Sequence, residues 1–271
     1  MNLSMKESIL CWFPDWYKEI DSKKQYLVLT DDLDSYYSCN YLKRLFGIQI
    51  GGFYSFEKGL YLNEELTCNK EPIYIDLSIT KGKTFDNHFT FIQNPLSINP
   101  NRFVSPTEYY KKYNGSTLAL LKSIYSPNEL GQLDNNLLSA ILCIDSWYVG
   151  YYKSNGRYRD INMQWFDMLG YTDYVLPLLN AKNDQYFKDF ALDNSLNAKI
   201  YIDEHGYLYS EANKDFPKCK FDLVLPITKV VVSRDEAESR YRRNPDSILI
   251  SVETYKDKYI LNVVKERSTY N

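Results

Sequence analysis

The stretch Tyr26-Leu-Val-Leu-Thr-Asp-Asp-Leu-Asp34 decides the fold, because an apolar run of strand length leads there into three acidic residues. The apolar part, Tyr26–Thr30, predicts a buried strand that enters a functional turn. Apolar residues then recur at helical spacing from Ser35 to Phe46, and Gly47 ends the predicted helix. A strand, an acidic turn and a helix in this order are typical of an α/β sheet with a ligand crevice beyond the carboxyl ends of its strands.

The same alternation continues outward from this stretch. Further strands are predicted at Ile48–Phe53, Pro72–Leu77 and within Phe85–Ile92, and the second of them again brings an aspartate to its end. We therefore expect an α/β fold with a mainly parallel, open sheet that is flanked by helices. The helices are expected to follow in one block: Ser105–Tyr113, Ser116–Tyr125, Gly131–Tyr151, Met163–Leu169 and Tyr174–Phe190.

After Asn194 the pattern changes to short strands around one helix near Asp235–Arg243. We place a boundary near residues 190–197, which divides the chain into a larger domain, 1–193, and a small α+β domain, 194–271. The strands expected in the second domain are Lys199–Asp203, Tyr207–Ser210, Leu223–Ile227, Lys229–Val232, Ser247–Thr254 and Lys258–Lys265.

The composition excludes several classes of protein. A net charge of −3 over 271 residues gives no global attraction to nucleic acid, so a basic binding surface would have to be local. Five cysteines, odd in number and without a CxxC pair, argue against a disulfide framework or a zinc ribbon. No apolar run approaches the roughly 18 residues of a membrane span, and no signal peptide is visible, so we expect a cytoplasmic protein that avoids membranes.

Four aspartates occupy positions where a carboxylate is costly to bury. Asp32 and Asp34 follow one predicted strand, Asp76 ends another, and Asp145 continues the apolar stripe of the helix expected at Gly131–Tyr151. Clustered carboxylates in a low dielectric repel one another unless cations hold them, and oxygen ligands favour Mg²⁺ or Mn²⁺. Taken singly, a strand-end aspartate is more often a helix cap, and a helical one is more often paired with an arginine.

The order of four short motifs resembles the DHH phosphoesterase superfamily, with its RecJ-like, nano-RNase-like and family II pyrophosphatase-like branches. Asp32-Leu-Asp34-Ser-Tyr-Tyr-Ser38 is similar to the first motif, DxDxxxS, and Ile75-Asp76 to the second. Phe85-Asp86-Asn87-His88 stands where the Asp-His-His of the family is found, and Leu137–Asp145 is similar to the fourth motif. The likeness covers roughly residues 26–150 and implies a DHH-like domain over 1–193.

The resemblance implies a metal centre and its ligands. Asp32, Asp34, Asp76 and Asp145, with Asn87 in the place of a histidine, would hold one or two Mn²⁺ or Mg²⁺ ions. Such ions activate a water for in-line attack on phosphorus and stabilise the leaving oxygen. Because Asn87 is a neutral donor, one of the two ions would be held more weakly than in the family.

Catalytic and substrate-binding roles also follow from the resemblance. Asp34, Asp86 and His88 would be catalytic, with Asp86 orienting its neighbours, while His88 and Ser38 would contact the substrate. The C-terminal region lacks the Gly-rich GGGH loop of the usual companion domain, and residues 247–265 are at most a reduced version of it.

Two segments interleave arginines with tyrosines, as single-stranded nucleic-acid sites do. They are Arg157-Tyr-Arg159 and Arg240-Tyr-Arg-Arg243, and we take Arg240 and Arg242 as candidate substrate contacts. A solvated helix face or loop explains such segments equally well.

The leading hypothesis is a metal-dependent phosphodiesterase that acts on a nucleotide or a short single-stranded oligonucleotide. A catalytically impaired DHH module that binds nucleic acid or a protein, and a pyrophosphate or polyphosphate hydrolase, stay open. A haloacid-dehalogenase phosphatase is disfavoured because Tyr36 stands where its DxDxT pattern requires threonine. The sequence leaves the oligomeric state open.

Overall fold

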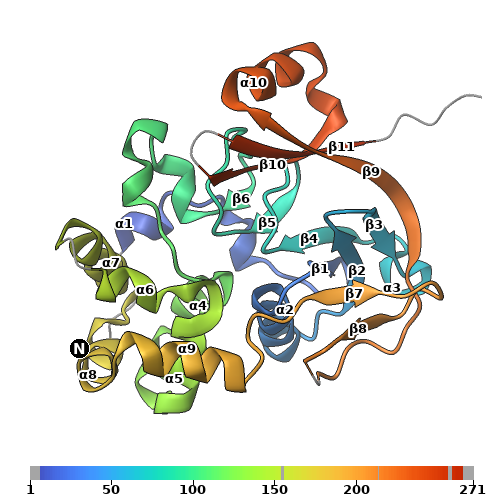
Figure 1. Ribbon diagram of the computed structural model, residues 1–271. Coiled ribbons are helices and arrows are strands. Elements are labelled where there is room, and N and C mark those ends of the chain that lie inside the picture. Colours follow the sequence, from blue (N-terminus) through green and yellow to red (C-terminus); the bar gives the residue numbers. More distant parts are fainter. Residues whose placement is uncertain (1–6, 154–155, 213, 256–257, 265–271) are drawn as a thin grey trace, which may run out of the picture.

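The computed structural model describes residues 7–153, 156–212, 214–255 and 258–264, and its centre is a mixed sheet of nine strands (Figure 1). A separate pair, β7 (Ile200–Ile202) and β8 (Leu208–Ser210), lies outside this sheet. In spatial order the nine strands are β10 (Ile248–Tyr255), β11 (Lys258–Val264), β9 (Asp222–Ser233), β3 (Gly59–Leu62), β2 (Ile50–Ser55), β1 (Gln25–Leu29), β4 (Glu71–Ile75), β5 (Lys83–Phe85) and β6 (Ser97–Ile98).

Five neighbouring strands, in the spatial order β2, β1, β4, β5 and β6, are parallel and carry the predicted α/β pattern. All five residues of β1 are buried, and Leu27 pairs with Ile50 on one side and Ile73 on the other. Helix α2 (Leu33–Phe46) begins directly after β1, with the Asp32 side chain accepting a hydrogen bond from the Ser35 amide. Gly47 ends the helix in the left-handed conformation, at φ 69°.

The other half of the sheet is antiparallel, so the expected mainly parallel sheet is confirmed only in part. Four of the eight strand pairings are antiparallel: β2 with β3, β3 with β9, β9 with β11, and β11 with β10. Strand β9 runs unbroken for 12 residues, although two strands were predicted there. It arches along one side of the molecule from β3 up to β11, which carries the sheet out of plane (Figure 1).

The sheet curls far enough for its last strand to reach the connection between β4 and β5. The Thr80 amide donates to the carbonyl of Leu249 at 2.8 Å, and the Thr80 hydroxyl donates to the carbonyl of Ile248 at 2.7 Å. An antiparallel bridge also joins Ile79 to Ile250. Residues near the C-terminal end of the described chain therefore fix a loop next to the carboxyl end of β4.

The helices form two groups. Helices α4 to α9 gather on one side of the parallel strands, while α10 packs on β9 and β11 at the far end of the sheet (Figure 1). The buried core of the first group holds Trp147, Phe166, Tyr171 and Phe187. Besides α2, the helices are α1 (Glu7–Leu10), α3 (Glu64–Thr67), α4 (Thr117–Tyr125), α5 (Asn135–Cys143), α6 (Tyr148–Tyr152), α7 (Gly156–Leu169), α8 (Thr172–Ala181), α9 (Asp184–Asp193) and α10 (Arg234–Arg243).

The single helix predicted at Gly131–Tyr151 is wrong. Residues 127–132 form a 3-10 turn, α5 ends at Cys143, and Asp145 and Ser146 have positive φ values of 57° and 56°. This break turns Asp145 out of the helical stripe on which the sequence pattern placed it. The helix expected at Ser105–Tyr113 is likewise only a 3-10 turn, Pro106–Lys111.

The predicted boundary near residues 190–197 falls between α9 and β7. Beyond it, β9 hydrogen-bonds to β3, so the C-terminal part adds three strands to the sheet of the N-terminal part. Within the described residues, no helix is both long and apolar enough to cross a membrane. Lys265, the last residue of the final predicted strand, lies outside the described residues.

Candidate metal centre

Acidic residues from three parallel strands meet at the carboxyl edge of the sheet. Asp32 and Asp34 follow β1, Asp76 follows β4, and Asp86 follows β5. Asp76 takes the left-handed conformation at φ 57°, an uncommon one for a residue with a side chain. The left-handed turn after α5 adds Asp145, so four separate segments supply the carboxylates.

The carboxylate of Asp34 is buried against the N-terminus of α4. It accepts hydrogen bonds from the amides of Thr117 at 2.6 Å and Leu118 at 2.9 Å, and from the Ser38 hydroxyl at 3.3 Å. The partial positive charge of a helix N-terminus favours an anion at this place. Desolvation nevertheless raises the pKa of Asp34 well above its ordinary value, and the charges of Asp145 and Asp32 raise it further.

Asp76 is equally buried, with 2% of its surface exposed. Its Oδ1 accepts a hydrogen bond from the Thr117 hydroxyl at 2.9 Å. Desolvation raises its pKa well above the ordinary value, followed by the charges of Asp32, Asp34 and Asp145. In the part of the chain that the structure describes, no lysine or arginine forms an ion pair with Asp34, Asp76 or Asp145. Among the described residues, the side chain that can offset their charge is His88, whose Nδ1 lies 3.9 Å from Oδ1 of Asp76.

Asp86 and His88 form a hydrogen-bonded pair beside Asp76. Oδ1 of Asp86 lies 2.7 Å from Nδ1 of His88, and Oδ2 accepts from Ser78 and Asn99, each at 2.9 Å. Burial disfavours the imidazolium, but the charge of Asp86 and its hydrogen bond outweigh burial and raise the pKa of His88 to about 9. His88 is consequently cationic at neutral pH in the absence of a bound ion.

Asn87 turns its amide nitrogen toward Asp145. Its Nδ2 donates to the carbonyl of Gly115 at 2.9 Å and also to the carboxylate of Asp145. Its Oδ1 is buried and has no hydrogen-bond partner among the described residues. Asn87 therefore stabilises the charge of Asp145, and only a rotated amide would present its oxygen to a cation near that carboxylate.

Asp145 lies at the mouth of the site. As a residue it is exposed. Desolvation of its carboxyl and the charge of Asp32 raise its pKa, while His88 and the hydrogen bond from Asn87 lower it.

Two groups of ligand atoms are compact enough for an ion. Within each group the ligand atoms lie within 4.8 Å of one another, and both groups share Asp76. The first is Asp34, Asp76 and Asp145; the second is Asp76, Asp86 and His88. The donors are mostly carboxylate oxygens, as Mg²⁺ and Mn²⁺ prefer, and the uncompensated burial supplies the physical reason for an ion.

Asp32 belongs to neither compact group. One of its oxygens caps α2 and the other lies 3.7 Å from Nζ of Lys199, which also pairs with Asp31 at 3.2 Å. Burial opposes the charge of Lys199, but Asp32 and Asp31 raise its pKa above the ordinary value. Asp32 thus lies between the buried acids and a cation of the C-terminal half.

A cavity of about 560 Å³ opens beside the acids, and we call it the lysine cavity. Three lysines bring positive charge to it, and Phe56, Tyr109 and Ile260 give it apolar surface. Lys229 pairs with Glu57 across part of its rim at 2.6 Å. Its lining is Asp31, Asp32, Phe56, Glu57, Asp76, His88, Tyr109, Lys112, Lys199, Lys229 and Ile260.

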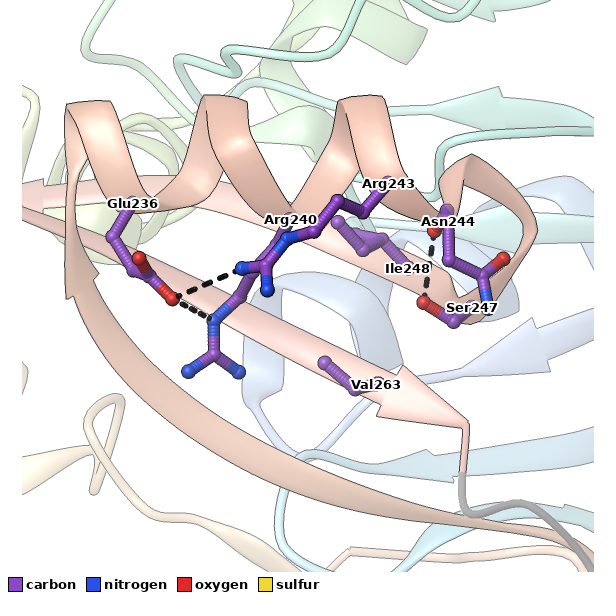
Figure 2. A pocket seen from close by; sticks show the side chains of 7 residues that line it. All are labelled: Glu236, Arg240, Arg243, Asn244, Ser247, Ile248 and Val263. Atoms are coloured by element: carbon purple, nitrogen blue, oxygen red, sulfur yellow. Dashed lines mark hydrogen bonds and ion pairs between the residues drawn. The ribbon is translucent and has the colours of Figure 1, made fainter.

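The structure does not bring the two predicted arginine contacts to this cavity. Figure 2 shows Arg240 on α10, paired with Glu236 at 2.7 Å, in a different pocket that Val263 of β11 also lines. Arg242 pairs with Glu238 of the same helix at 3.1 Å. Ser38 is fully buried and donates to Asp34, which suits a positioning role better than contact with a substrate. The substrate roles of these residues stay predictions.

The residues that sequence reasoning missed lie mainly outside the four motifs. Thr117 contacts both Asp34 and Asp76, and the helix-start pattern Ser116-Thr117 before an apolar run could have indicated it. Lys199 and Lys229 lie in segments that carry no motif, and only the three-dimensional fold places them near the acids.

No family model, no curated protein and no solved structure matches this chain. The likeness to the DHH superfamily therefore rests on the four sequence motifs and stays a prediction.

Replacing Asn87 by histidine is expected to tighten manganese binding about tenfold, within the range reported for changes around metal ligands. The imidazole would add a stronger nitrogen donor beside Asp145, where the asparagine amide now donates a hydrogen bond. Calorimetric titration of the metal-free protein with Mn²⁺ measures the effect. Asn136→His, on the exposed face of α5, is the matched control. Equal affinities in Asn87→His and wild type would refute a ligand position there.

Proposed function

We propose that this protein is a metal-dependent phosphoesterase that hydrolyses a phosphodiester of a nucleotide or a short single-stranded oligonucleotide. The observation that carries the proposal is the convergence of Asp34, Asp76 and Asp145 next to the Asp86–His88 pair. Asp34 and Asp76 are buried, and among the described residues no lysine or arginine pairs with any of the three; His88 lies 3.9 Å from Asp76. Structural carboxylates are usually paired when buried, so an acid cluster of this kind is best explained by divalent cations.

The protein's own residues can perform the remaining chemistry. Mn²⁺ or Mg²⁺, when bound, supplies a Lewis acid and a hydroxide at neutral pH. His88 has 36% of its side chain exposed and lines the lysine cavity, where its imidazolium can donate a proton to the leaving oxygen when only the group of Asp34, Asp76 and Asp145 holds an ion. Asp86 holds that imidazolium in place. Lys199 is placed to balance negative charge that develops on the phosphoryl oxygens.

The lysine cavity supports an anionic substrate with an apolar part. Lys112, Lys199 and Lys229 offer charge to phosphates, while Tyr109 and Phe56 offer aromatic surface. The net charge of the chain is −3 and the lining also holds Asp31, Asp32, Glu57 and Asp76, so the positive charge offered to a polyanion is limited to these lysines, His88 and any bound cations. Inorganic pyrophosphate would use the lysines and leave the aromatic surface without a role.

A panel of four substrates tests the proposal: bis(p-nitrophenyl) phosphate, a cyclic dinucleotide, trithymidylate and pyrophosphate, each with Mn²⁺ and each with a chelator. We expect turnover of the diesters with Mn²⁺ and none with the chelator, and the Asp34→Asn/Asp76→Asn protein supplies the background. Wild-type turnover no greater than this background on all four substrates would refute the proposed phosphoesterase activity. Turnover of pyrophosphate alone would favour an anhydride hydrolase, and binding of trithymidylate without turnover would favour an impaired binding module.

A further inference from the structure

A second cavity, of about 650 Å³, lies on the other side of Asp145 and belongs to the helical half of the chain. We call it the tyrosine cavity, because Tyr109, Tyr110 and Tyr158 line it. None of the four motifs that resemble the DHH family contributes to it except through Asp145. Its lining is Tyr109, Tyr110, Lys112, Asn114, Asp145, Ser146, Val149, Gly150, Lys153, Tyr158, Ile161 and Asn162.

Each tyrosine of this cavity has a cation over its ring. Nζ of Lys112 lies 4.7 Å from the ring centre of Tyr109, and Nζ of Lys153 lies 5.6 Å from that of Tyr158. The guanidinium carbon of Arg157 lies 3.2 Å from the ring centre of Tyr110. Aromatic faces with adjacent cations are the combination that binds the bases and the phosphates of a single strand together.

One wall of the cavity carries a buried polar group with unused bonding capacity. Asn162 is 1% exposed, and its Nδ2 donates to the carbonyl of Trp147 at 3.0 Å. Its Oδ1 has no hydrogen-bond partner among the described residues. Gly150 makes room for it, since a Cβ at that position would lie only 2.9 Å from the amide carbon of Asn162. An unpaired acceptor in such a place costs free energy unless a ligand or water donates to it.

The tyrosine cavity is adjacent to the lysine cavity. Tyr109 and Lys112 line both of them. Asp145 borders the first and Asp76 the second, and these two carboxylates belong to one compact group. A ligand that occupies both cavities would therefore lie beside the acids.

We propose that the tyrosine cavity binds the nucleobase adjacent to the scissile phosphate of a single-stranded oligonucleotide. This inference rests on the proposed function and deepens it: the substrate spans at least two nucleotides, one on each side of the acids. The base stacks on a tyrosine, and Lys112 and Lys153 neutralise the flanking phosphates. Pyrophosphate and mononucleotide esters are too short to fill both cavities.

The decisive comparison is between a trinucleotide and a small diester in the variant Tyr158→Ala. Tyr158 is 40% exposed, so the substitution removes a stacking face with little loss of core packing. We expect the ratio of kcat/KM for trithymidylate to kcat/KM for bis(p-nitrophenyl) phosphate to fall about tenfold, which is within the range for one lost base stack. Lys153→Ala should lower the same ratio and flatten its dependence on salt.

The matched control is Tyr207→Ala, because Tyr207 is 46% exposed and lines neither cavity beside the acids. Its ratio is expected to equal that of the wild type. A ratio in Tyr158→Ala that equals the control would overturn the inference and leave the phosphoesterase proposal intact.

A binding measurement without turnover separates failure of the inference about the tyrosine cavity from failure of the proposed enzyme activity. Calorimetric titration of each protein with trithymidylate in a chelator measures the cavity alone, and we expect Tyr158→Ala to weaken binding about tenfold relative to Tyr207→Ala. If no diester is hydrolysed, the proposed enzyme fails while this difference still supports the cavity. Equal dissociation constants in the two variants would reject the cavity whatever the enzyme does.

Discussion

Replacing Asp76 by asparagine is expected to lower kcat for a phosphodiester on the order of a thousandfold, the size of effect seen when a group that stabilises a transition state is removed. Asp76 is the only residue common to both compact ligand groups, so its neutralisation weakens every cation position that the described acids can form. Its other contact is a hydrogen bond from Thr117, and the amide oxygen of asparagine can still accept it.

Thermal unfolding distinguishes a loss of catalysis from a loss of folded protein. Because Asp76→Asn removes a buried charge that its neighbours repel, the metal-free variant should unfold at the wild-type temperature or above it. Asp193→Asn, on the exposed end of α9, makes the same chemical change outside the site and should keep wild-type kcat. Full activity in a folded Asp76→Asn protein would remove Asp76 from the catalytic centre.

Without metal, the protein is expected to lose stability as the pH rises from about 5 to 9. The folded-state pKa values of Asp34 and Asp76 are raised well above the ordinary value of 3.8. Such carboxyls stabilise the fold while they are protonated, and that contribution disappears as the pH climbs through their raised pKa values. The raised pKa of His88, about 9, acts in the same direction, because its contribution is complete below the unfolded value and is lost toward pH 9.

The measurement is the unfolding temperature at several pH values, in a chelator and with saturating Mn²⁺. For a chain of this size each kcal/mol shifts the midpoint by about 2–4 °C, so a fall of several degrees toward pH 9 is readily detected. Mn²⁺ should reduce the fall, because it binds the ionised carboxylates of the folded state. The substitution Asp76→Asn should also reduce this fall in unfolding temperature when the chelator is present. A midpoint that rises steadily from pH 5 to 9 without metal would contradict the repulsion between these acids.

The parallel half of the sheet could be predicted because its strands are short, fully buried and followed by capped helices. Tyr26–Thr30 and the helix after it carry all of these features locally. The antiparallel half could not be predicted in the same way. Strand β3 has four residues, and β9 passes through Pro226, which normally breaks a strand, while its pairing with β3 joins residues far apart in the sequence.

The site could be predicted in part. Asp32, Asp34, Asp76 and Asp86 follow predicted strands or lie at their ends, and the carboxyl ends of parallel strands share one edge of the sheet, so their side chains were expected to lie close together. The backbone of Asp145 was not predictable from apolar periodicity, because a left-handed turn interrupts the helical stripe there. Lys199 was missed for another reason: its position depends on how the C-terminal half folds back over β1, where the Ile200 amide donates to the carbonyl of Asp31. Long-range placement of this kind leaves no local pattern.

The contact between Thr80 and the residues of β10 also affects when the site can form during synthesis of the chain. The hydroxyl of Thr80 donates to a carbonyl 168 positions later in the chain. At a synthesis rate of about 5–20 residues per second, roughly 8–34 seconds pass between the emergence of the β4–β5 loop and that of the strand which holds it. We expect the acids of a growing chain to emerge before this contact can form, so the proposed hydrolytic activity would begin only after β10 has emerged. Assaying ribosome-bound chains that stop before and after β10 would measure this delay, and equal activity in both would refute it.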